Sequence, residues 1–311
     1  MSGTGVRPRV SVVTIFLDSE RFLQEAIESV LAQSSTDWEL LLIDDGSTDG
    51  STALAQTYAA QYPGRVRYFD HPGHRNVGKS TSRNLGIREA RGEYVTFLDA
   101  DDVLLPDKLE RQTRLLAAHP EAAMVYGRTE YWFSWTGELR ARRRDFIPGL
   151  GSSHGAPIEP PALVSRFLRR GGSVPCLCGV LARTAAVVEV GGFDESIQDL
   201  YEDQVLLAKL CLEWPVLVET GCGERYRQHP DSSSSAAIRS GAYHPWRPNR
   251  ARAAYLDWLA AYATGRGISD PAFWKAMRAE LRLYRHPIAA RLASPILHLA
   301  QSVSARLETW R

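Results

Sequence analysis

The feature that most constrains the fold is the alternation of short apolar runs with amphipathic segments over residues 10–126. Runs rich in β-branched and other apolar residues predict strands at 10–16, 40–43, 66–69, 94–98 and 122–126. Apolar residues at helical spacing predict helices between them, at 22–31, 49–58, 80–91 and 109–118. This alternation is typical of a Rossmann-like α/β fold, in which a mainly parallel sheet carries helices on both faces.

Length and charge narrow the class of protein further. The 311 residues suffice for one large α/β domain or two closely fused halves. A net charge of +1 argues against a nucleic-acid binder, and no apolar run approaches the roughly 20 residues that cross a bilayer. The polar N-terminus does not resemble a secretion signal, so we expect a cytoplasmic protein whose four cysteines are free thiols.

Two acidic clusters stand directly after predicted strands. Asp44 and Asp45 follow the second strand, and the acidic run 99–102 follows the fourth. Ligands of such sheets bind beyond the carboxyl ends of the strands. Carboxylates at that edge suit a divalent ion, a ribose or a nucleotide base, because they offer hard oxygen ligands and hydrogen-bond acceptors. A solvated acidic turn is the alternative interpretation of each cluster.

A glycine-containing loop precedes the third predicted helix. Gly78, Lys79, Arg83 and the start of the helix could together favour a diphosphate. Residues 73–80 also satisfy the letters of the phosphate-binding P-loop, G-x-x-x-x-G-K-[ST]. A P-loop follows its strand directly, whereas residues 70–72 intervene here, so the context argues against an ATPase.

Two further polar groups occur in the second half of the chain. Glu202 and Asp203 open the apolar helix predicted at 205–212, where a carboxylate could act as a general base. The alternative is an acidic pair that only favours the helix dipole. His229 could bind a metal through a neutral imidazole, although a lone histidine is more often structural.

The rest of the chain is less regular. Residues 132–170 are rich in glycine and proline and contain a basic run at 140–144, which predicts a surface excursion or a mobile lid. A polar break is predicted at 232–235, followed by helices at 252–262, 271–284 and 287–310. Arginines beside apolar residues in these helices could contact an anionic membrane. Packing against the rest of the chain, or against a second copy, is the alternative.

Taken in order, these motifs resemble the family 2 glycosyltransferases, which have the GT-A fold. The matching segments are 11–13, 26–33, 39–50, 92–102, 191–195 and 202–203, and the resemblance covers roughly residues 10–235. It implies a catalytic domain over 1–235, with a nucleotide-sugar-binding half at about 9–102 and an acceptor-binding half at about 103–235. Residues 236–311 would then form a helical C-terminal extension.

The resemblance also implies residue roles. Asp203 would be the catalytic base, with Glu202 supporting the acceptor, and Asp101 with His229 would bind Mn²⁺ or Mg²⁺. The family often carries Pro-x-Tyr-Asn after the first strand, where this chain reads Ile-Phe-Leu-Asp at 15–18, which leaves Phe16 as the aromatic candidate for stacking on the base. The complete donor-binding set is Ile15, Phe16, Asp44, Asp45, Gly78, Lys79, Arg83, Asp99 and Ala100.

The implied activity is transfer of a sugar from a nucleoside diphosphate donor, expected to be a UDP-sugar, to an acceptor hydroxyl with inversion. The acceptor would be a glycan, a lipid-linked molecule or a protein, in cell-surface polysaccharide or glycan biosynthesis, at the inner face of the membrane. A homo-oligomer is compatible with this. Alternatives are a retaining GT-A enzyme, a non-catalytic nucleotide-sugar-binding module, and a nucleotidyltransferase making nucleotide sugars, whose glycine-rich opening motif is missing here.

Overall fold

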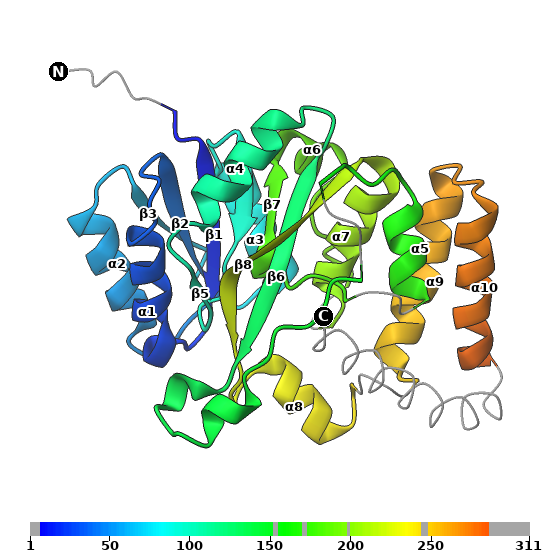
Figure 1. Ribbon diagram of the computed structural model, residues 1–311. Coiled ribbons are helices and arrows are strands. Elements are labelled where there is room, and N and C mark those ends of the chain that lie inside the picture. The colour runs from blue at the N-terminus through cyan, green and yellow to red at the C-terminus, as the bar shows by residue number, and fades with distance from the viewer. Residues whose placement is uncertain (1–6, 152–154, 170–172, 198–199, 244–247, 286–311) are drawn as a thin grey trace.

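The protein is built on one mixed β-sheet. The computed structural model describes residues 7–151, 155–169, 173–197, 200–243 and 248–285. Helices pack on both faces of the sheet (Figure 1). Each face buries its own cluster of apolar side chains, so the sheet separates two hydrophobic layers.

The first half of the sheet is parallel and confirms the predicted alternation. Its strands are β1 (Val10–Phe16), β2 (Trp38–Asp44), β3 (Val66–Asp70) and β4 (Tyr94–Phe97). The connecting helices are α1 (Glu20–Leu31), α2 (Ser51–Gln61) and α3 (Lys79–Glu89). Because parallel strands joined by helices all point the same way, their carboxyl ends meet at one edge of the sheet.

The second half mixes strand directions, which apolar alternation alone does not reveal. Its elements are β5 (Val103–Leu104), α4 (Lys108–Ala118), β6 (Met124–Trp132), β7 (Val180–Arg183), α6 (Thr184–Glu189), α7 (Glu202–Glu213) and β8 (Val216–Arg227). Strand β7 is antiparallel to β4 and β6, and β5 is antiparallel to β8. The order across the sheet is β3-β2-β1-β4-β7-β6-β8-β5.

The connection between β6 and β7 corrects one prediction. It holds two short 3₁₀ turns, η1 (Ser134–Thr136) and η2 (Ala141–Arg144), then helix α5 (Ala162–Leu168) and a third turn, η3 (Leu177–Gly179). The prediction that residues 132–170 are irregular is therefore wrong for the residues that form α5. Leu163, Val164 and Leu168 recur on one side of this helix and are buried in the core, which stabilises it. The mobility of a lid in this region stays a prediction.

Within the described residues, three helices follow β8. They are α8 (Ser233–Ser240), α9 (Arg250–Gly265) and α10 (Pro271–Arg285). The helices predicted at 252–262 and 271–284 are confirmed, and the one predicted at 287–310 lies outside the described residues. The polar break predicted at 232–235 is wrong, because the Ser232 side chain accepts a hydrogen bond from Ser235 N and so caps α8.

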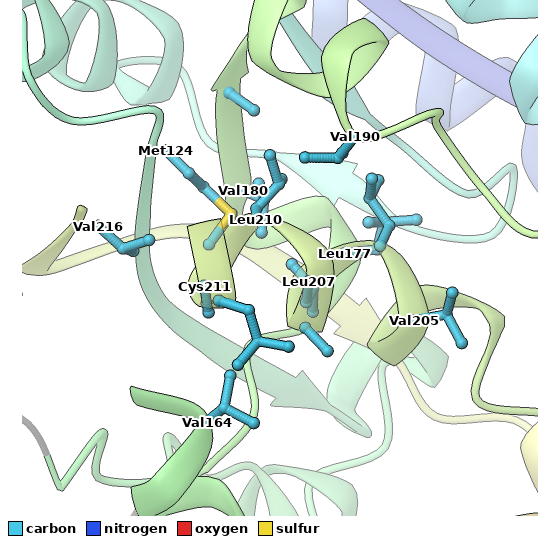
Figure 2. Close-up of a cluster of buried hydrophobic side chains, with 14 of the residues drawn as sticks. Met124, Val164, Leu177, Val180, Val190, Val205, Leu207, Leu210, Cys211 and Val216 are labelled. Carbon is cyan, nitrogen blue, oxygen red and sulfur yellow. The ribbon is translucent and has the colours of Figure 1, made fainter. Parts of the chain in front are cut away.

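Helix α7 lies in the larger of the two apolar clusters. Figure 2 shows its residue Leu210 beside Met124 of β6 and Val180 of β7, with Leu207 and Val205 in the same cluster. The same cluster contains side chains from both C-terminal helices, namely Tyr255, Leu256, Leu259, Ala263, Phe273, Ala276 and Met277. Helices α9 and α10 therefore share the hydrophobic core of the sheet rather than standing apart from it.

One buried polar network crosses the other layer. Lys108 of α4 is fully buried, and its ammonium donates to Gln112 Oε1 at 2.8 Å and to Thr96 Oγ1 at 3.2 Å. Gln112 in turn donates to Glu219 Oε1 of β8 at 2.8 Å. Burial lowers the pKa of Lys108, and the nearby Glu224 carboxylate opposes that shift. The network ties α4 to β4 and β8.

The structure also bears on the membrane-spanning helices and the cysteines. Across residues 7–285, outside the gaps, no helix is both long and apolar enough to cross a bilayer. The cysteines are free thiols as predicted: Cys178 and Cys211 are buried, and Cys176 and Cys222 are partly buried.

Candidate active site

Predicted site residues stand just beyond β2 and β4, and those after β4 converge with residues of α3 and α7. Arg83 of α3 shows this convergence most directly. Its Nη2 lies 2.8 Å from Asp99 Oδ1, just after β4, and its Nη1 lies 2.9 Å from Glu202 Oε1, at the start of α7. Carboxylates that are distant in the sequence therefore share one guanidinium.

Arg83 is a buried bridge. It is 2% exposed, so its charge is compensated by two carboxylates rather than by water. Desolvation opposes its charge, but Asp99 and Glu202 outweigh that effect and raise its pKa further above the usual range. The guanidinium lowers the pKa of Asp99 against the effect of desolvation, with help from Lys79. Contact of Arg83 with a diphosphate stays a prediction.

Asp203 follows Glu202 and is partly buried. The protein raises its pKa to about 7, first by desolvating the carboxyl group and then through the negative charge of Glu202. Its Oδ1 accepts a hydrogen bond from Gln204 N at 2.7 Å. A carboxyl group that titrates near neutrality is suited to take up a proton at physiological pH, as a general base must.

The backbone directly before this acidic pair is strained. Tyr201 has a φ of +69°, a left-handed conformation that residues with a side chain rarely adopt. Holding a bulky residue there costs about 1 kcal/mol or more, so its surroundings must fix it. Sequence reasoning missed Tyr201, because no residue pattern distinguishes it from an ordinary residue before a helix.

Asp45 anchors the loop between β3 and α3. It is 4% exposed, and its carboxylate accepts the backbone N–H groups of Val77 at 2.8 Å and Gly78 at 3.2 Å. A carboxylate thus occupies the position at the start of α3 where a P-loop would hold phosphate. This geometry argues further against the P-loop interpretation. Contact of Asp45 with a nucleotide base stays a prediction.

Asp44 shapes the turn after β2. It is fully buried, and its Oδ1 accepts the N–H groups of Gly46 and Ser47. Its Oδ2 accepts the hydroxyls of Thr52 at 2.6 Å and Tyr68 at 3.3 Å. Four hydrogen bonds within the protein satisfy this carboxylate, which favours a role in holding the turn. A direct donor contact stays a prediction.

Gly46 and Lys79 complete this side of the site. Gly46 has a φ of +88°, and a Cβ there would lie 2.7 Å from the backbone nitrogen of Asn76. The turn after β2 and the loop after β3 therefore approach so closely at Gly46 that no side chain fits between them. Lys79, at the start of α3, directs its Nζ to Ser233 Oγ of α8 at 2.9 Å.

Three of the predicted donor-binding residues are largely buried. Ile15, Phe16 and Ala100 are 8%, 2% and 5% exposed, and Phe16 packs in the apolar cluster with α1. This burial favours packing for Phe16, and its stacking on a base stays a prediction. The exposed apolar side chain at the end of β1 is Leu17, at 41%. Leu17 stands where the family pattern has tyrosine, which is the signal that could have found it.

Asp101 and His229 form a second pair of side chains, and their binding of a metal stays a prediction. His229 Nε2 lies 2.9 Å from Asp101 Oδ2, although 127 residues separate them in the chain. His229 is 7% exposed and packs against the ring of Phe22 at a centroid distance of 4.7 Å. Its Nδ1 is buried without a hydrogen-bond partner among the described residues. The imidazole is therefore fixed by ring packing with Nε2 directed at the carboxylate.

This pair fits a divalent ion in its chemistry. A carboxylate oxygen and an imidazole nitrogen are both ligands for Mn²⁺, and Mg²⁺ commonly takes one or two carboxylates with substrate phosphates and water. Among the described residues, no group of three or more His, Cys, Asp or Glu side chains is placed to hold a metal. Asp101 and His229 would thus supply few ligands, leaving the remaining positions to a ligand's oxygens.

Arg227 holds the acidic run in place. Its backbone N–H donates to Asp102 Oδ1 at 2.9 Å, and its Nε donates to the backbone oxygen of Asp101 at 2.6 Å. Desolvation raises the pKa of Asp102, and the charge of Asp101 adds to that shift. The sequence could not reveal this role, since it depends on β8 passing beside the end of β4.

Solved structures share this fold. Residues 1–349 of S. aureus TarS, in complex with UDP-GlcNAc, match with a TM-score of 0.65 at 16% identity, covering 88% of this chain and 72% of that one. A mannosyltransferase from Pyrobaculum calidifontis, in complex with GDP-Man and Mn²⁺, matches with a TM-score of 0.60 at 18% identity, covering 97% and 76%. The fold is therefore the GT-A fold of nucleotide-sugar transferases.

The sequence comparison gives the family. Residues 11–182 match the family described as "Glycosyl transferase family 2", and the chain belongs to this family. Putative glycosyltransferase EpsE of Bacillus subtilis is 39% identical over 118 residues, 38% of this chain and 42% of that protein. The putative teichuronic acid biosynthesis glycosyltransferase TuaG of Bacillus subtilis is 36% identical over 115 residues, 36% and 44%. The match spans less than half the length of either relative.

Proposed function

We propose that this protein transfers a sugar from a nucleoside diphosphate donor to an acceptor hydroxyl, with Asp203 as the general base. The observation that carries the proposal is the Arg83 bridge. It joins Asp99, beside the Asp101–His229 pair, to Glu202, beside a carboxyl group whose pKa is raised to about 7. A charge-binding side and a proton-accepting side thus meet around one buried guanidinium.

The proposed reaction is a direct displacement at the anomeric carbon of the donor. The acceptor oxygen attacks the anomeric carbon while the bond from that carbon to the diphosphate oxygen breaks, and the hydroxyl proton passes to Asp203. Attack from the side opposite the diphosphate inverts the anomeric centre, and the configuration of the product tests this. Asp45 and Asp99 would hold the base and the ribose of the donor, Gly78, Lys79 and Arg83 would lie on its phosphate side, and Glu202 would support the acceptor.

Asp101 and His229 would hold a divalent ion. Such an ion, Mn²⁺ or Mg²⁺, supplies positive charge that stabilises the departing diphosphate. The chain's own part is to present Asp101 through the bonds from Arg227 and to fix the His229 ring against Phe22. These contacts restrict both ligands before any ion arrives.

The substrates belong to the same proposal. UDP-GlcNAc and GDP-Man are the nucleotide sugars bound by the two solved relatives in fold, and we favour a UDP-sugar donor. The description of TuaG refers to teichuronic acid biosynthesis, and we propose a polysaccharide, a lipid-linked glycan or a glycoprotein as the acceptor here.

Contact with the inner face of a membrane belongs here as well. The exposed side of α10 carries Lys275, Arg278 and Arg282, a basic stripe suited to anionic lipid. Co-sedimentation with phosphatidylglycerol vesicles at low salt tests this contact. Reversing the three charges to glutamate should abolish sedimentation, and sedimentation unchanged by the reversal would exclude the contact.

Donor binding is the direct test of the proposed function. UDP-GlcNAc and GDP-mannose should each be screened for a rise in melting temperature, with and without Mn²⁺. A ligand at a hundred times its Kd stabilises a fold by about 2.7 kcal/mol. We expect one nucleotide sugar to stabilise the protein more with Mn²⁺ than without it. Asp101→Asn, which keeps the shape and removes the charge, should lose the Mn²⁺-dependent part, and no stabilisation under any condition would refute the proposal.

A further inference from the structure

Helix α9 carries a row of stacked aromatic rings, here called the ladder, which ends two residues before the candidate base Asp203. Tyr255 and Trp258 lie with ring centroids 6.2 Å apart, and Trp258 and Tyr262 lie 5.2 Å apart, both nearly parallel. The Tyr255 ring stacks in turn on Tyr201, at 5.3 Å and an interplanar angle of 17°. Tyr201 directly precedes Glu202 and Asp203, so the ladder reaches the first turn of α7.

The ladder is also attached to the chain on both sides of that turn. Trp258 Nε1 donates to Asp194 Oδ2 at 2.9 Å, upstream of α7. The Tyr262 hydroxyl donates to Glu213, the last residue of α7. Helix α9 therefore contacts the segment before α7, its first turn through Tyr201, and its end.

The ladder lies beside the apolar stripe that anchors α9 in the core, and its Tyr255 belongs to the same cluster. Leu256, Leu259 and Ala263 are each fully buried and belong to the main apolar cluster. The rings stand one residue earlier in each turn of the helix. Because the apolar stripe already fixes α9 to the core, the stack on Tyr201 is an additional contact, made at a residue with a φ of +69°.

We propose that α9 is a positioning element for the general base, in which the Tyr255 ring holds Tyr201 in its left-handed conformation and so sets the direction of the Asp203 carboxyl. This inference rests on the proposed function, because it takes Asp203 as the base. It assigns a role in the reaction to a helix outside residues 11–182, which carry the family match. The positioning residues are Tyr201 and Tyr255, and neither needs to touch a substrate.

Hydrogen–deuterium exchange on the whole chain tests the structural half of the proposal without any ligand. Tyr255→Leu removes the stack and keeps an apolar side chain, and Tyr255→Phe keeps the ring. Trp274→Leu on α10 is the matched control, because Trp274 packs against the same cluster but has no ring contact with the ladder. We expect amides 201–206 to exchange at least tenfold faster in Tyr255→Leu only. Equal exchange in Tyr255→Leu and Trp274→Leu would overturn the inference.

Release of nucleoside diphosphate tests the catalytic half, with water in place of the acceptor and UDP-GlcNAc or GDP-mannose as the donor, whichever stabilises the fold more. Tyr255→Leu should lower kcat at least tenfold and leave the KM for the donor within twofold, while Tyr255→Phe and Trp274→Leu keep both. If Tyr255→Leu fails to fold, Tyr255→Met takes its place. An unchanged kcat in Tyr255→Leu, beside an inactive Asp203→Asn, overturns this inference alone. An active Asp203→Asn overturns the base assignment instead.

Discussion

At the scale of single residues, the site depends on which carboxylates are compensated by positive charge. Arg83 pairs with Asp99 and Glu202, but no ion pair is formed by Asp203 within the described residues. Desolvation without a salt bridge raises a carboxyl pKa, whereas a buried arginine beside a carboxylate lowers it. The pKa of Asp99 is lowered and that of Asp203 is raised, so of these two carboxyl groups Asp203 is suited to exchange a proton near neutral pH.

Asp203→Asn is the first prediction at this scale. Asparagine keeps the size of the side chain and its bond to Gln204 N, but it cannot take a proton. We expect kcat to fall by about 10²- to 10⁴-fold, the usual contribution of a general base, with donor affinity nearly unchanged. Steady-state kinetics and calorimetric titration of the donor would measure the two effects. Weakened donor binding with unchanged turnover would contradict the assignment.

The pKa of Asp203 leads to a prediction for pH. The ionised form accepts the proton, so kcat should rise about tenfold per unit up to pH about 7 and then level off. For stability the sign is opposite. The folded state holds this proton more tightly than the unfolded chain, so stability is lost as the pH rises from about 4 to about 7. Asp203→Asn should be more stable than the native protein at pH 8 and equal to it at pH 4, as urea unfolding would show.

At the scale of elements, two loops are fitted together by backbone. The turn after β2 and the loop after β3 touch at Gly46 and Asn76, and Asp45 binds the second loop through its amides. Asp49 adds a further tie, since its carboxylate accepts the N–H groups of Glu20 in α1 and Ser51 in α2. The proposed donor side of the site is thus a set of loops that hold one another.

Gly46→Ala tests this fit against a matched glycine. Gly64 also has a positive φ, of +82°, but a Cβ there would meet nothing within 4 Å. We expect Gly64→Ala to cost about 1 kcal/mol from backbone strain alone. Gly46→Ala should cost about 3 kcal/mol, since a backbone clash adds to the strain. Chemical denaturation gives both values, and equal costs would show that the loops can separate freely.

The sequence predicts the half of the protein that contains β1 to β4 well, and the half that contains α5 and β7 less well. Apolar runs suffice to predict β1 to β4, and the acids that follow these runs suffice to place Asp45, Asp99 and Asp101 at strand ends, because these features are local. The antiparallel course of β7 and helix α5 depend on packing between distant segments, which spacing does not encode. The partners of Arg83 and the strain at Tyr201 are likewise set by tertiary contacts. Sequence reasoning thus placed the carboxylates but not what orients them.

At the scale of the whole molecule, the C-terminal helices are part of the core. Tyr255 and Leu256 of α9, with Phe273 and Met277 of α10, lie in the apolar cluster that contains α7. The division into a catalytic domain at 1–235 and a helical extension at 236–311 stays a prediction. It does not follow that the first part is stable alone, because removing α9 and α10 would expose the apolar faces of α5 and α7.

Truncation tests this. A chain ending at residue 243 should lose cooperative thermal unfolding or aggregate, because a large apolar surface would face water. Calorimetry and light scattering would measure both. A truncated chain that unfolds cooperatively near the melting temperature of the full protein would show that α9 and α10 are dispensable for folding, and that their contacts matter only for the reaction.

The buried ammonium of Lys108 has a consequence for how this sequence can change over time. A methionine at that position would leave the Gln112 Oε1 without its donor, and an apolar residue at position 112 would remove the shortest of the hydrogen bonds that the buried ammonium donates. Each single step therefore passes through a destabilised intermediate, whereas both substitutions together need not. Neutral drift at these two positions should be correlated, and one substitution should open the way to the other.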